Sequence, residues 1–351
     1  MKNFWLKLNK PIYALAPMAG VADSAFRQIC KSFGADIVYS EMISATAIVY
    51  NSKKTLELMK FDKKERPYVV QLFGSRPEHF AQAAKFVTNK IKPDGLDINF
   101  GCPVKKVIKQ GAGSALMTDL KLARQAVEAV INNTNLPVSV KIRSSAGKIT
   151  ALDFLKEMRG LPISAVMIHG RTVEQGNGGP VDYKIIKQAR KYFSGIILAN
   201  GGVADKKSAG EFLKKTGADG VGIGQGALGR PWIFKNVKSL SFRGERSETR
   251  NRLKMKMENL RDFSLSRPNR GLVEMTDKEI FKTMLKHAKL AEKLKGKEGI
   301  IEMRKHLCWY VNGLKNASEL RQRLVKAKGL GEIKNILSIY KKFDHYVKQP
   351  K

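Results

Sequence analysis

The chain has 351 residues, of which 65 are Lys or Arg and 31 are Asp or Glu, so its formal net charge is +34. This length exceeds what one hydrophobic core usually organises, and we expect one large domain with a smaller one beside it. The charge far exceeds what solubility requires and indicates a polyanionic partner. About half of the excess lies between Lys235 and the C-terminus. A generally lysine-rich surface with no such partner is the alternative.

The cysteines and the N-terminus narrow the class of protein further. The three cysteines are Cys30, Cys102 and Cys308. Their wide spacing argues against a zinc site or a disulfide framework and favours a reducing compartment. Lysines precede an apolar stretch that starts at Ile12, as in a secretory signal, but Pro11 and Pro17 interrupt it, and no run of about 18 apolar residues follows. We expect a monomeric cytoplasmic protein with no metal site and no membrane segment.

Eight short apolar or β-branched runs recur through the first two thirds of the chain, and helical patterns lie between them. The predicted strands are Ile12 to Ala16, Ile37 to Ser40, Tyr68 to Leu72, Gly95 to Ile98, Val138 to Ile142, Ala165 to Ile168, Gly195 to Ala199 and Gly220 to Ile223. The predicted helices are Ala22 to Phe33, Pro77 to Lys90, Leu120 to Asn132, Tyr183 to Tyr192 and Lys206 to Thr216. Such repeated alternation predicts an α/β fold, the (β/α)8 TIM barrel.

A doubly wound open sheet shares this alternation, so the ends of the strands decide between the two folds. Residues able to bond or carry charge follow nearly every predicted strand: Pro17-Met18-Ala19, Glu41, Gln71, Asn99, Lys141, His169, Asn200 and Gly224. A TIM barrel builds its active site from such strand ends. The turn after the first strand also lacks the G-x-G-x-x-G pattern of a dinucleotide-binding sheet. The barrel is therefore the favoured prediction.

The pattern changes after the eighth strand. We predict a barrel domain over residues 1–240, a linker over 241–250 within the polar stretch Ser239 to Asn251, and a basic helical domain over 251–351. Thr276 to Glu279 and Asn316 to Glu319 both have the spacing of a helix capping box. One helical face carries a predicted packing stripe of Ile280, Met284, Leu285, Ala288 and Ala291.

One cysteine occupies a position suited to chemistry. The segment Asp97 to Pro103 places Cys102 on a loop at the mouth of the fourth strand, followed by Lys105 and Lys106. Cysteines are usually core residues, which is what we expect of Cys30 and Cys308. We expect Cys102 instead to be exposed in an electropositive setting, where its thiol could act as a nucleophile or as a proton donor.

Further candidates follow the fifth to eighth strands. The Asn200-Gly201-Gly202 and Gly222-Ile223-Gly224-Gln225-Gly226 motifs place small residues where barrels bind phosphate. Lys141 could balance negative charge on a cofactor ring or form a Schiff base, as an aldolase lysine does. His169 and Arg171 bring an imidazole and a planar cation to the rim, and such an Arg suits phosphate or carbonyl recognition. A histidine bonded only to the backbone is the alternative for His169.

Together these motifs resemble those of the tRNA-dihydrouridine synthases, and the bacterial DusB-like branch looks closest. The motifs that carry the resemblance are Ala16 to Gly20, Gln71, Asp97 to Pro103, Lys105-Lys106, Gly111 to Ala115, Lys141 to Arg143, Ile168 to Thr172 and Gly229 to Phe234. The resemblance covers the barrel and resumes at Arg304-Lys305-His306 and Trp309-Tyr310. The cysteine loop with its two following lysines is the most specific of these motifs.

The resemblance implies that the protein reduces the C5=C6 bond of selected uridines in tRNA, using FMN that NADPH reduces. Cys102 would protonate C5 after hydride reaches C6, with a thiol pKa near neutrality. The implied flavin contacts are Pro17, Met18, Ala19, Gln71, Lys141, His169, Asn200, Gly201, Gly202, Gly224 and Gln225. The candidate substrate contacts are Asn99 and Arg171 for uracil, with Lys105, Lys106 and Arg304 for the RNA.

Two positions depart from the family's pattern, and three other functions stay open. Gln225 stands where the family commonly has arginine, which predicts looser flavin, and Asn177 stands where an aromatic residue is expected. The other functions are an FMN-dependent reductase of free pyrimidines or dihydroorotate, a Schiff-base aldolase using Lys141, and a non-catalytic RNA-binding barrel. The basic C-terminal third argues against the first, because a free pyrimidine needs no positively charged appendage. Bound FMN would exclude the second as the main activity.

Overall fold

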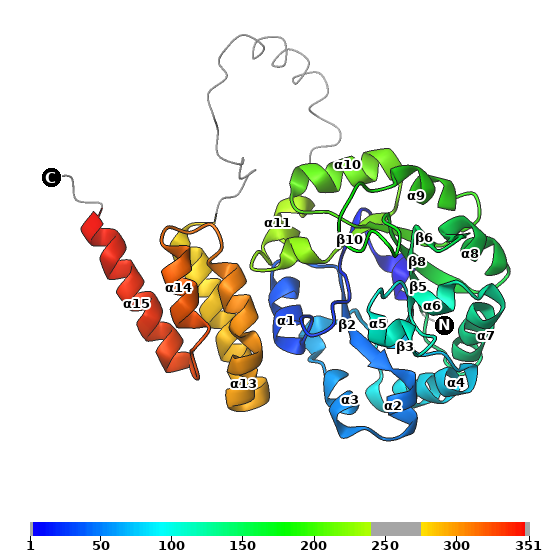
Figure 1. The fold of residues 1–351 in the computed structure, drawn as a ribbon, viewed down its shortest axis with the longest axis horizontal. Helices are drawn as coiled ribbons and strands as arrows, with labels where there is room; N and C mark the ends of the chain where they lie inside the picture. Colours follow the sequence, from blue (N-terminus) through cyan, green and yellow to red (C-terminus); the bar gives the residue numbers. More distant parts are fainter. Residues whose placement is uncertain (1–2, 240–274, 348–351) are drawn as a thin grey trace, which may run out of the picture.

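A computed structural model describes residues 3–239 and 275–347 of the chain. Eight parallel strands close into a barrel in the order β1-β10-β9-β8-β5-β4-β3-β2 (Figure 1). The strands are β1 (Ile12–Leu15), β2 (Ile37–Ser44), β3 (Tyr68–Phe73), β4 (Gly95–Phe100), β5 (Val138–Arg143), β8 (Ile163–His169), β9 (Ile196–Asn200) and β10 (Gly220–Ile223). The predicted TIM barrel is confirmed, and each predicted strand overlaps an observed one.

Helices surround the barrel between successive strands. They are α1 (Ser24–Ser32), α2 (Ala45–Val49), α3 (Lys53–Leu58), α4 (Pro77–Phe86), α5 (Lys105–Ile108), α6 (Ser114–Met117), α7 (Leu120–Ile131), α8 (Ala151–Glu157), α9 (Tyr183–Ala189), α10 (Lys206–Thr216) and α11 (Ile233–Lys238). All five predicted helices are present. Aspartate side chains begin several of them; Asp119, for example, accepts a hydrogen bond from the backbone of Leu122 at the start of α7. A short hairpin, β6 (Ser145–Ala146) and β7 (Ile149–Thr150), follows β5.

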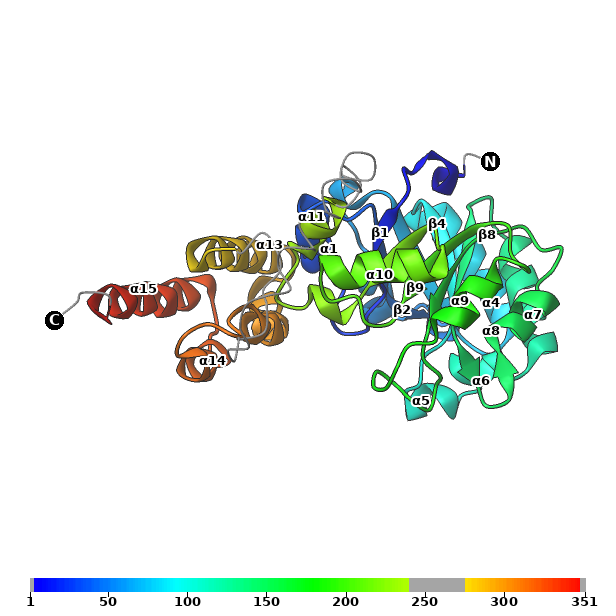
Figure 2. The same ribbon diagram turned by 90° about the horizontal axis from the view of Figure 1, so that it is seen from above.

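The N-terminal segment closes one end of the barrel. A short 3-10 helix, Phe4–Lys7, precedes β1, and its Trp5 is buried in a cluster with Ile12 and Ala14 of that strand. Figure 2 shows this segment and α5 at opposite ends of the barrel. The end that carries α5 is the carboxyl end of the strands, where the predicted site residues lie.

A helical unit extends from the α1 side of the barrel (Figures 1 and 2). It consists of α13 (Asp277–Tyr310), α14 (Ala317–Leu324) and α15 (Leu330–Val347), and α13 bends at Gly296, where φ is +61°. The predicted packing stripe on α13 lies in the core of this unit. The predicted linker, residues 241–250, lies outside the described residues, and so do its borders with the two predicted domains. None of the described helices is long and apolar enough to span a bilayer.

The barrel and the helical unit share a core. Phe26 of α1 packs against His287 and His306 of α13, with ring centroids 5.7 and 4.7 Å apart. Burial lowers the pKa of His287 to about 4 and that of His306 well below its usual value, so both rings are neutral at pH 7.

The sequence predicted that Cys30 and Cys308 are both core residues, and only one of them is. Cys30 is buried as predicted, whereas Cys308 is only half-buried.

The two predicted capping boxes differ. Thr276 and Glu279 form one, because each side chain bonds the other residue's backbone N–H. Asn316 forms none; it has a left-handed backbone with φ +52° and no side-chain cap bond, although α14 does begin after it. Thr276→Ala is expected to lower the free energy of unfolding by about 1 kcal/mol, because it removes a cap. Asn316→Gly should change it by less than about 0.5 kcal/mol. Thermal unfolding of both variants tests this, and equal losses would contradict it.

Candidate active site

The loop after β4 holds Cys102 at the carboxyl end of the barrel. The Oδ1 of Asn99 accepts hydrogen bonds from the backbone N–H groups of Gly101 and Cys102, both at 3.0 Å. The Ser114 hydroxyl donates to the carbonyl of Cys102 at 2.8 Å. Gly113, at φ +63°, approaches so closely that a Cβ on it would lie 3.0 Å from the Cβ of Cys102. The cysteine is therefore fixed by contacts on two sides of its loop.

The thiol of Cys102 is more enclosed than the sequence predicted. Its residue is only 7% exposed and belongs to a small apolar cluster. Burial raises its pKa, although a backbone hydrogen bond from Val104 and the charges of Arg143 and Lys141 oppose that rise. The expectations of an exposed thiol and of a pKa near neutrality are therefore both wrong. A thiol that stays protonated at pH 7 suits a proton donor better than a nucleophile.

A buried chain of hydrogen bonds crosses three strands beneath the cysteine loop. The Ser139 hydroxyl and the Gln71 amide nitrogen donate to the two oxygens of Asp97, each at 2.6 Å. The Oε1 of Gln71 accepts from the Nδ2 of Asn99 at 2.9 Å. The strand register brings these residues together, because Asp97 pairs with Gln71 on one side and with Ser139 on the other. The chain therefore runs from β5 to the backbone of the cysteine loop.

Asp97 sets the direction of this chain. A carboxylate only accepts hydrogen bonds, so Gln71 turns its amide nitrogen toward Asp97 and its oxygen toward Asn99. Asn99 then turns its own oxygen toward the loop. Burial raises the pKa of Asp97 to about 6, with bonds from Ser139 and Gln71 opposing the rise, so the carboxyl is mostly ionised at pH 7. The predicted flavin contact of Gln71 and uracil contact of Asn99 stay predictions.

Basic side chains from β5 and β8 line the neighbouring part of the mouth. Burial, and next the charge of Arg143, lower the pKa of Lys141 to about 8, so it is still largely charged at pH 7. A lowered lysine pKa also suits Schiff-base chemistry. Lys141 alone therefore does not decide whether it balances charge on a cofactor ring or forms a Schiff base. Burial and the charge of Lys141 lower the pKa of His169 to about 2, so its ring is neutral. The Nδ1 of His169 accepts from the backbone of Arg171 at 3.3 Å.

Arg143 is a further site residue, to which the sequence analysis assigned no role. It is buried, and its Nε donates to the carbonyl of Gly101 at 3.1 Å. Its Nη1 donates to the carbonyls of Thr172, at 3.1 Å, and of Gly176. Arg143 therefore ties the Cys102 loop to the loop that follows β8.

The loops after β9 and β10 leave several backbone N–H groups free. Gly201 and Gly202 have φ values of +118° and +128°, which residues with a side chain rarely adopt. Among the residues that the structure describes, the N–H groups at positions 202–203 and 224–225 have no hydrogen-bond partner. The two loops are neighbours because β9 pairs with β10. Free N–H groups on adjacent loops fit an anion such as phosphate.

Two predicted site residues hold these loops in place. The Nδ2 of Asn200 donates to the carbonyl of Gly222 at 2.8 Å, which joins β9 to β10. The Nη1 of Arg171 donates to the carbonyl of Gly201, and its Nε to that of Gly179, both at 2.8 Å. The structure thus brings Arg171 to the glycine loop. Its contact with uracil stays a prediction.

The predicted flavin-lining segment Pro17–Ala19 follows β1 at the same end of the barrel. Glu41, which lies within β2, accepts a hydrogen bond from the backbone of Gly20 and so holds this segment. The sulfur of Met18 lies 3.5 Å from the position that a Cβ on Gly224 would take. The segment therefore adjoins the loop after β10.

The remaining predicted residues lie farther out. Lys105 and Lys106 are exposed on α5, three and four residues after Cys102 in the chain. Gln225 and Asn177 are exposed on the loops after β10 and β8. Arg304 lies in the helical unit, where it donates to two backbone carbonyls after α14 at 2.9 and 3.3 Å. Its role in RNA binding stays a prediction.

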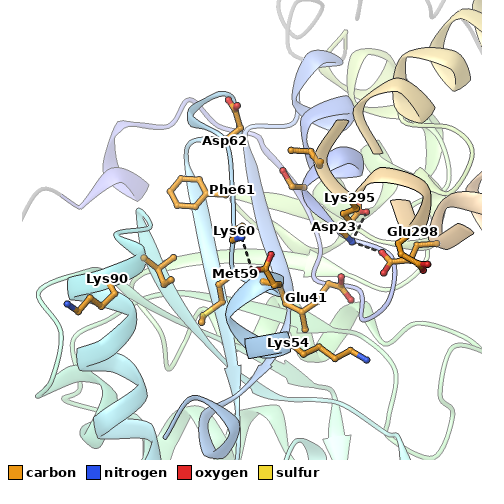
Figure 3. A pocket seen from close by; sticks show the side chains of 16 residues that line it. Asp23, Glu41, Lys54, Met59, Lys60, Phe61, Asp62, Lys90, Lys295 and Glu298 are labelled. Carbon is orange, nitrogen blue, oxygen red and sulfur yellow. Dashed lines mark hydrogen bonds and ion pairs between the residues drawn. The ribbon is translucent and has the colours of Figure 1, made fainter. Parts of the chain in front are cut away.

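A concavity of about 730 Å³ lies where the barrel meets α13 (Figure 3). Its acidic lining residues are Asp23, Glu41, Glu57, Asp62, Glu298 and Glu302, and its basic ones are Lys54, Lys60, Lys90 and Lys295. Lys295 pairs with Asp23 at 3.4 Å and with Glu302 at 2.5 Å. Acidic side chains outnumber basic ones here, against the +34 charge of the whole chain. The lining of this concavity is therefore net acidic and suits a polyanion poorly.

The comparison with protein families decides the affiliation of the chain. A family model described as Dihydrouridine synthase (Dus) matches residues 14–344, which include the barrel and most of the helical unit. The chain belongs to the dihydrouridine synthase family. It is 32% identical over 321 residues to "tRNA-dihydrouridine synthase B" of Xanthomonas axonopodis pv. citri, covering 91% of this chain and 89% of that one. The predicted resemblance to the dihydrouridine synthases, and to their DusB-like branch, is confirmed.

Other known proteins are similar to this family member in sequence or in fold. It is 36% identical over 236 residues to the "Probable tRNA-dihydrouridine synthase" of Aquifex aeolicus, covering 66% of this chain and 74% of that one. It shares a fold with histamine dehydrogenase from Rhizobium sp. 4-9, with a TM-score of 0.51 and 11% identity over 65% of this chain and 45% of that one. The second likeness shows the barrel architecture alone.

Proposed function

We propose that this member of the dihydrouridine synthase family reduces the C5=C6 bond of uridines in tRNA to give dihydrouridine, with bound FMN and with NADPH as reductant. The names of its relatives support the substrate. The observation that carries the proposal is the Cys102 thiol, protonated at neutral pH and held at the barrel mouth by Asn99 and Ser114. We expect the enzyme to act in the cytoplasm.

The residues at the mouth fit FMN. The free N–H groups at 202–203 and 224–225 would hold its phosphate, and Lys141 would balance negative charge on its ring. The Gln71 amide is fully buried and bonded to Asp97 and Asn99, so its contact with the flavin ring stays a prediction. When bound, FMN would supply the hydride that uracil receives at C6.

The chain's own part in the reaction is to provide the proton that C5 then needs. The Sγ of Cys102 is protonated in advance because burial raises its pKa. The charges of Arg143 and Lys141 would lower the cost of the thiolate left behind. Asn99 and Arg143 hold the loop from two directions, so the thiol position is set before substrate arrives.

The decisive experiment is an absorption spectrum of the purified protein, followed by mass spectrometry of nucleosides from unmodified tRNA incubated with it and NADPH. We expect flavin bands and uridines heavier by two hydrogens. A colourless protein that cannot be reconstituted with FMN would contradict the proposal. Flavin without any change in tRNA would indicate the small-molecule reductase, and borohydride trapping of a carbonyl substrate on Lys141 would indicate the aldolase.

Lys141 gives a pH test of the flavin site. Its pKa is lowered to about 8, so it is charged below that pH and neutral above it. The affinity of the flavin-free protein for FMN should therefore decrease as the pH rises through about 8. Lys141→Met should bind FMN more weakly and lose this pH dependence. Fluorescence titration of FMN across this pH range tests it, and an unchanged profile in the variant would assign the dependence to another group.

A further inference from the structure

A second concavity, of about 530 Å³, opens beside the Cys102 loop. We call it the α2–α4 pocket; its polar and aromatic lining residues are Ser44, Thr46, Tyr50, Phe73, Ser75, Arg76, His79 and Gln110. Ala112 also lines it and packs in the same apolar cluster as Cys102. A Cβ on Gly111 would lie 3.4 Å from the Cβ of Ser75, so the turn that follows α5 lies against this wall. The pocket therefore adjoins the reaction site at the carboxyl end of the barrel.

Tyr50 presents an aromatic face in this pocket. Its residue is 72% exposed, so most of the ring is open to solvent. Its ring meets the His79 ring edge-on, with centroids 6.2 Å apart and planes at 81°. This contact orients the tyrosine, and the 72% exposure leaves most of its ring surface accessible. Such a face suits the stacking of a nucleobase.

His79 adds a polar group that the protein itself does not fully use. The residue is 8% exposed, and its Nδ1 shares a hydrogen bond with the Thr46 hydroxyl at 2.9 Å. Within residues 3–239 and 275–347, its Nε2 has no hydrogen-bond partner. The Nε2 is not one of the buried unpaired atoms, so it faces the open pocket, where a polar ligand can bond it in place of water.

The charge of the pocket suits a phosphate. Arg76 is exposed at the start of α4, and no acidic residue is among the residues that line the pocket. Lys109, which follows α5, is also exposed and precedes the lining residue Gln110. This is the opposite of the acidic concavity beside α13. An aromatic face, a free imidazole nitrogen and an arginine together match the base and phosphate of a nucleotide.

We propose that the α2–α4 pocket binds the nucleotide that adjoins the target uridine in the RNA substrate, with its base stacked on Tyr50 and its phosphate at Arg76. The proposal rests on the proposed function. A uridine that leaves the base stack to reach Cys102 deprives its neighbour of a stacking partner, at a cost of unstacking energy. Tyr50 would replace that partner beside the reaction site and so offset the cost. An RNA nucleotide fits this place better than a free nucleotide, because the pocket adjoins the site that the uracil must enter.

The test is the affinity of the enzyme for an unmodified tRNA transcript at fixed salt. Stacking on an aromatic side chain contributes about 1–3 kcal/mol per base, so Tyr50→Ala should weaken binding about 5- to 150-fold. Tyr50→Phe keeps the ring and should stay within about twofold of the wild type. Leu6→Ala is the matched control, because Leu6 is 79% exposed at the opposite end of the barrel, and it should bind normally. Arg76→Gln should weaken binding and reduce its salt dependence by about one phosphate contact.

Flavin reduction by NADPH, measured in the same variants without RNA, separates the possible outcomes. It should not change in any of them. Tyr50→Ala with wild-type RNA affinity would overturn the pocket proposal and leave the proposed function intact. A raised KM for NADPH with normal RNA affinity would assign the pocket to the dinucleotide and also overturn it. If the wild type left tRNA unreduced, the proposed function would fail, and the RNA affinities would still decide the proposal about the pocket.

Discussion

Cys102→Ala should slow dihydrouridine formation in tRNA by about 100-fold or more, because a positioned general acid typically contributes a factor of about 10² to 10⁴. The thiol is protonated at pH 7 and held at the barrel mouth, so its loss removes a proton source that water reaches poorly in a site where the residue is 7% exposed. The measurement is a single turnover of pre-reduced enzyme with unmodified tRNA, followed by mass spectrometry of the nucleosides.

Two controls show whether the loss belongs to the proton step. Cys308→Ser changes a half-buried thiol of the helical unit, far along the chain from the mouth, and should leave the rate within about twofold of the wild type. Flavin reduction by NADPH should be unaffected in Cys102→Ala, since the thiol serves only the reaction with RNA. A Cys102→Ala enzyme with the wild-type single-turnover rate would mean that another group protonates the uracil.

The sequence predicts the barrel well because parallel strands are buried on both faces. Such strands are continuous apolar runs, as in Ile12–Leu15 and Gly220–Ile223, where every residue is buried. The hairpin of β6 and β7 was not predicted, because strands of two residues carry no periodic pattern. The cap at Asn316 was wrong for a similar reason. Its spacing matches a capping box, but Asn316 has a left-handed backbone in place of the extended one of a usual N-cap, and its side chain makes no cap bond.

The sequence predicted which strand ends carry the site residues, but not the contacts that these residues make with one another. Polar residues at every second position of β4 and β5 could have revealed the buried chain, because Asp97 and Ser139 interrupt otherwise apolar runs on inward positions. The burial of Cys102 could not have been predicted. It depends on α5 and α6 folding back over the loop, which brings Gly113 against the cysteine. The role of Arg143 likewise depends on carbonyls supplied by distant loops.

Replacing Asp97 by Asn and Ser139 by Ala together should lower the rate of dihydrouridine formation about 30-fold, whereas either change alone should lower it less than about fivefold. In Asp97→Asn the new amide nitrogen can donate to the Ser139 hydroxyl, and the amide oxygen still accepts from Gln71. In Ser139→Ala the carboxylate still accepts from Gln71. Either single variant therefore keeps the direction of the hydrogen bonds from Ser139 to Asn99.

In the double variant, the new amide nitrogen at position 97 has no acceptor other than the side-chain oxygen of Gln71. To provide one, Gln71 must reverse, and Asn99 must reverse after it and present its amide nitrogen to the N–H groups of the cysteine loop. Each unpaired buried donor costs about 1–3 kcal/mol, so the loop should shift rather than accept two of them. Alkylation of the Cys102 thiol by iodoacetamide should then be faster in the double variant than in either single one. If the rate loss of the double variant were simply the product of the two single losses, Asp97 would not set the direction of these hydrogen bonds.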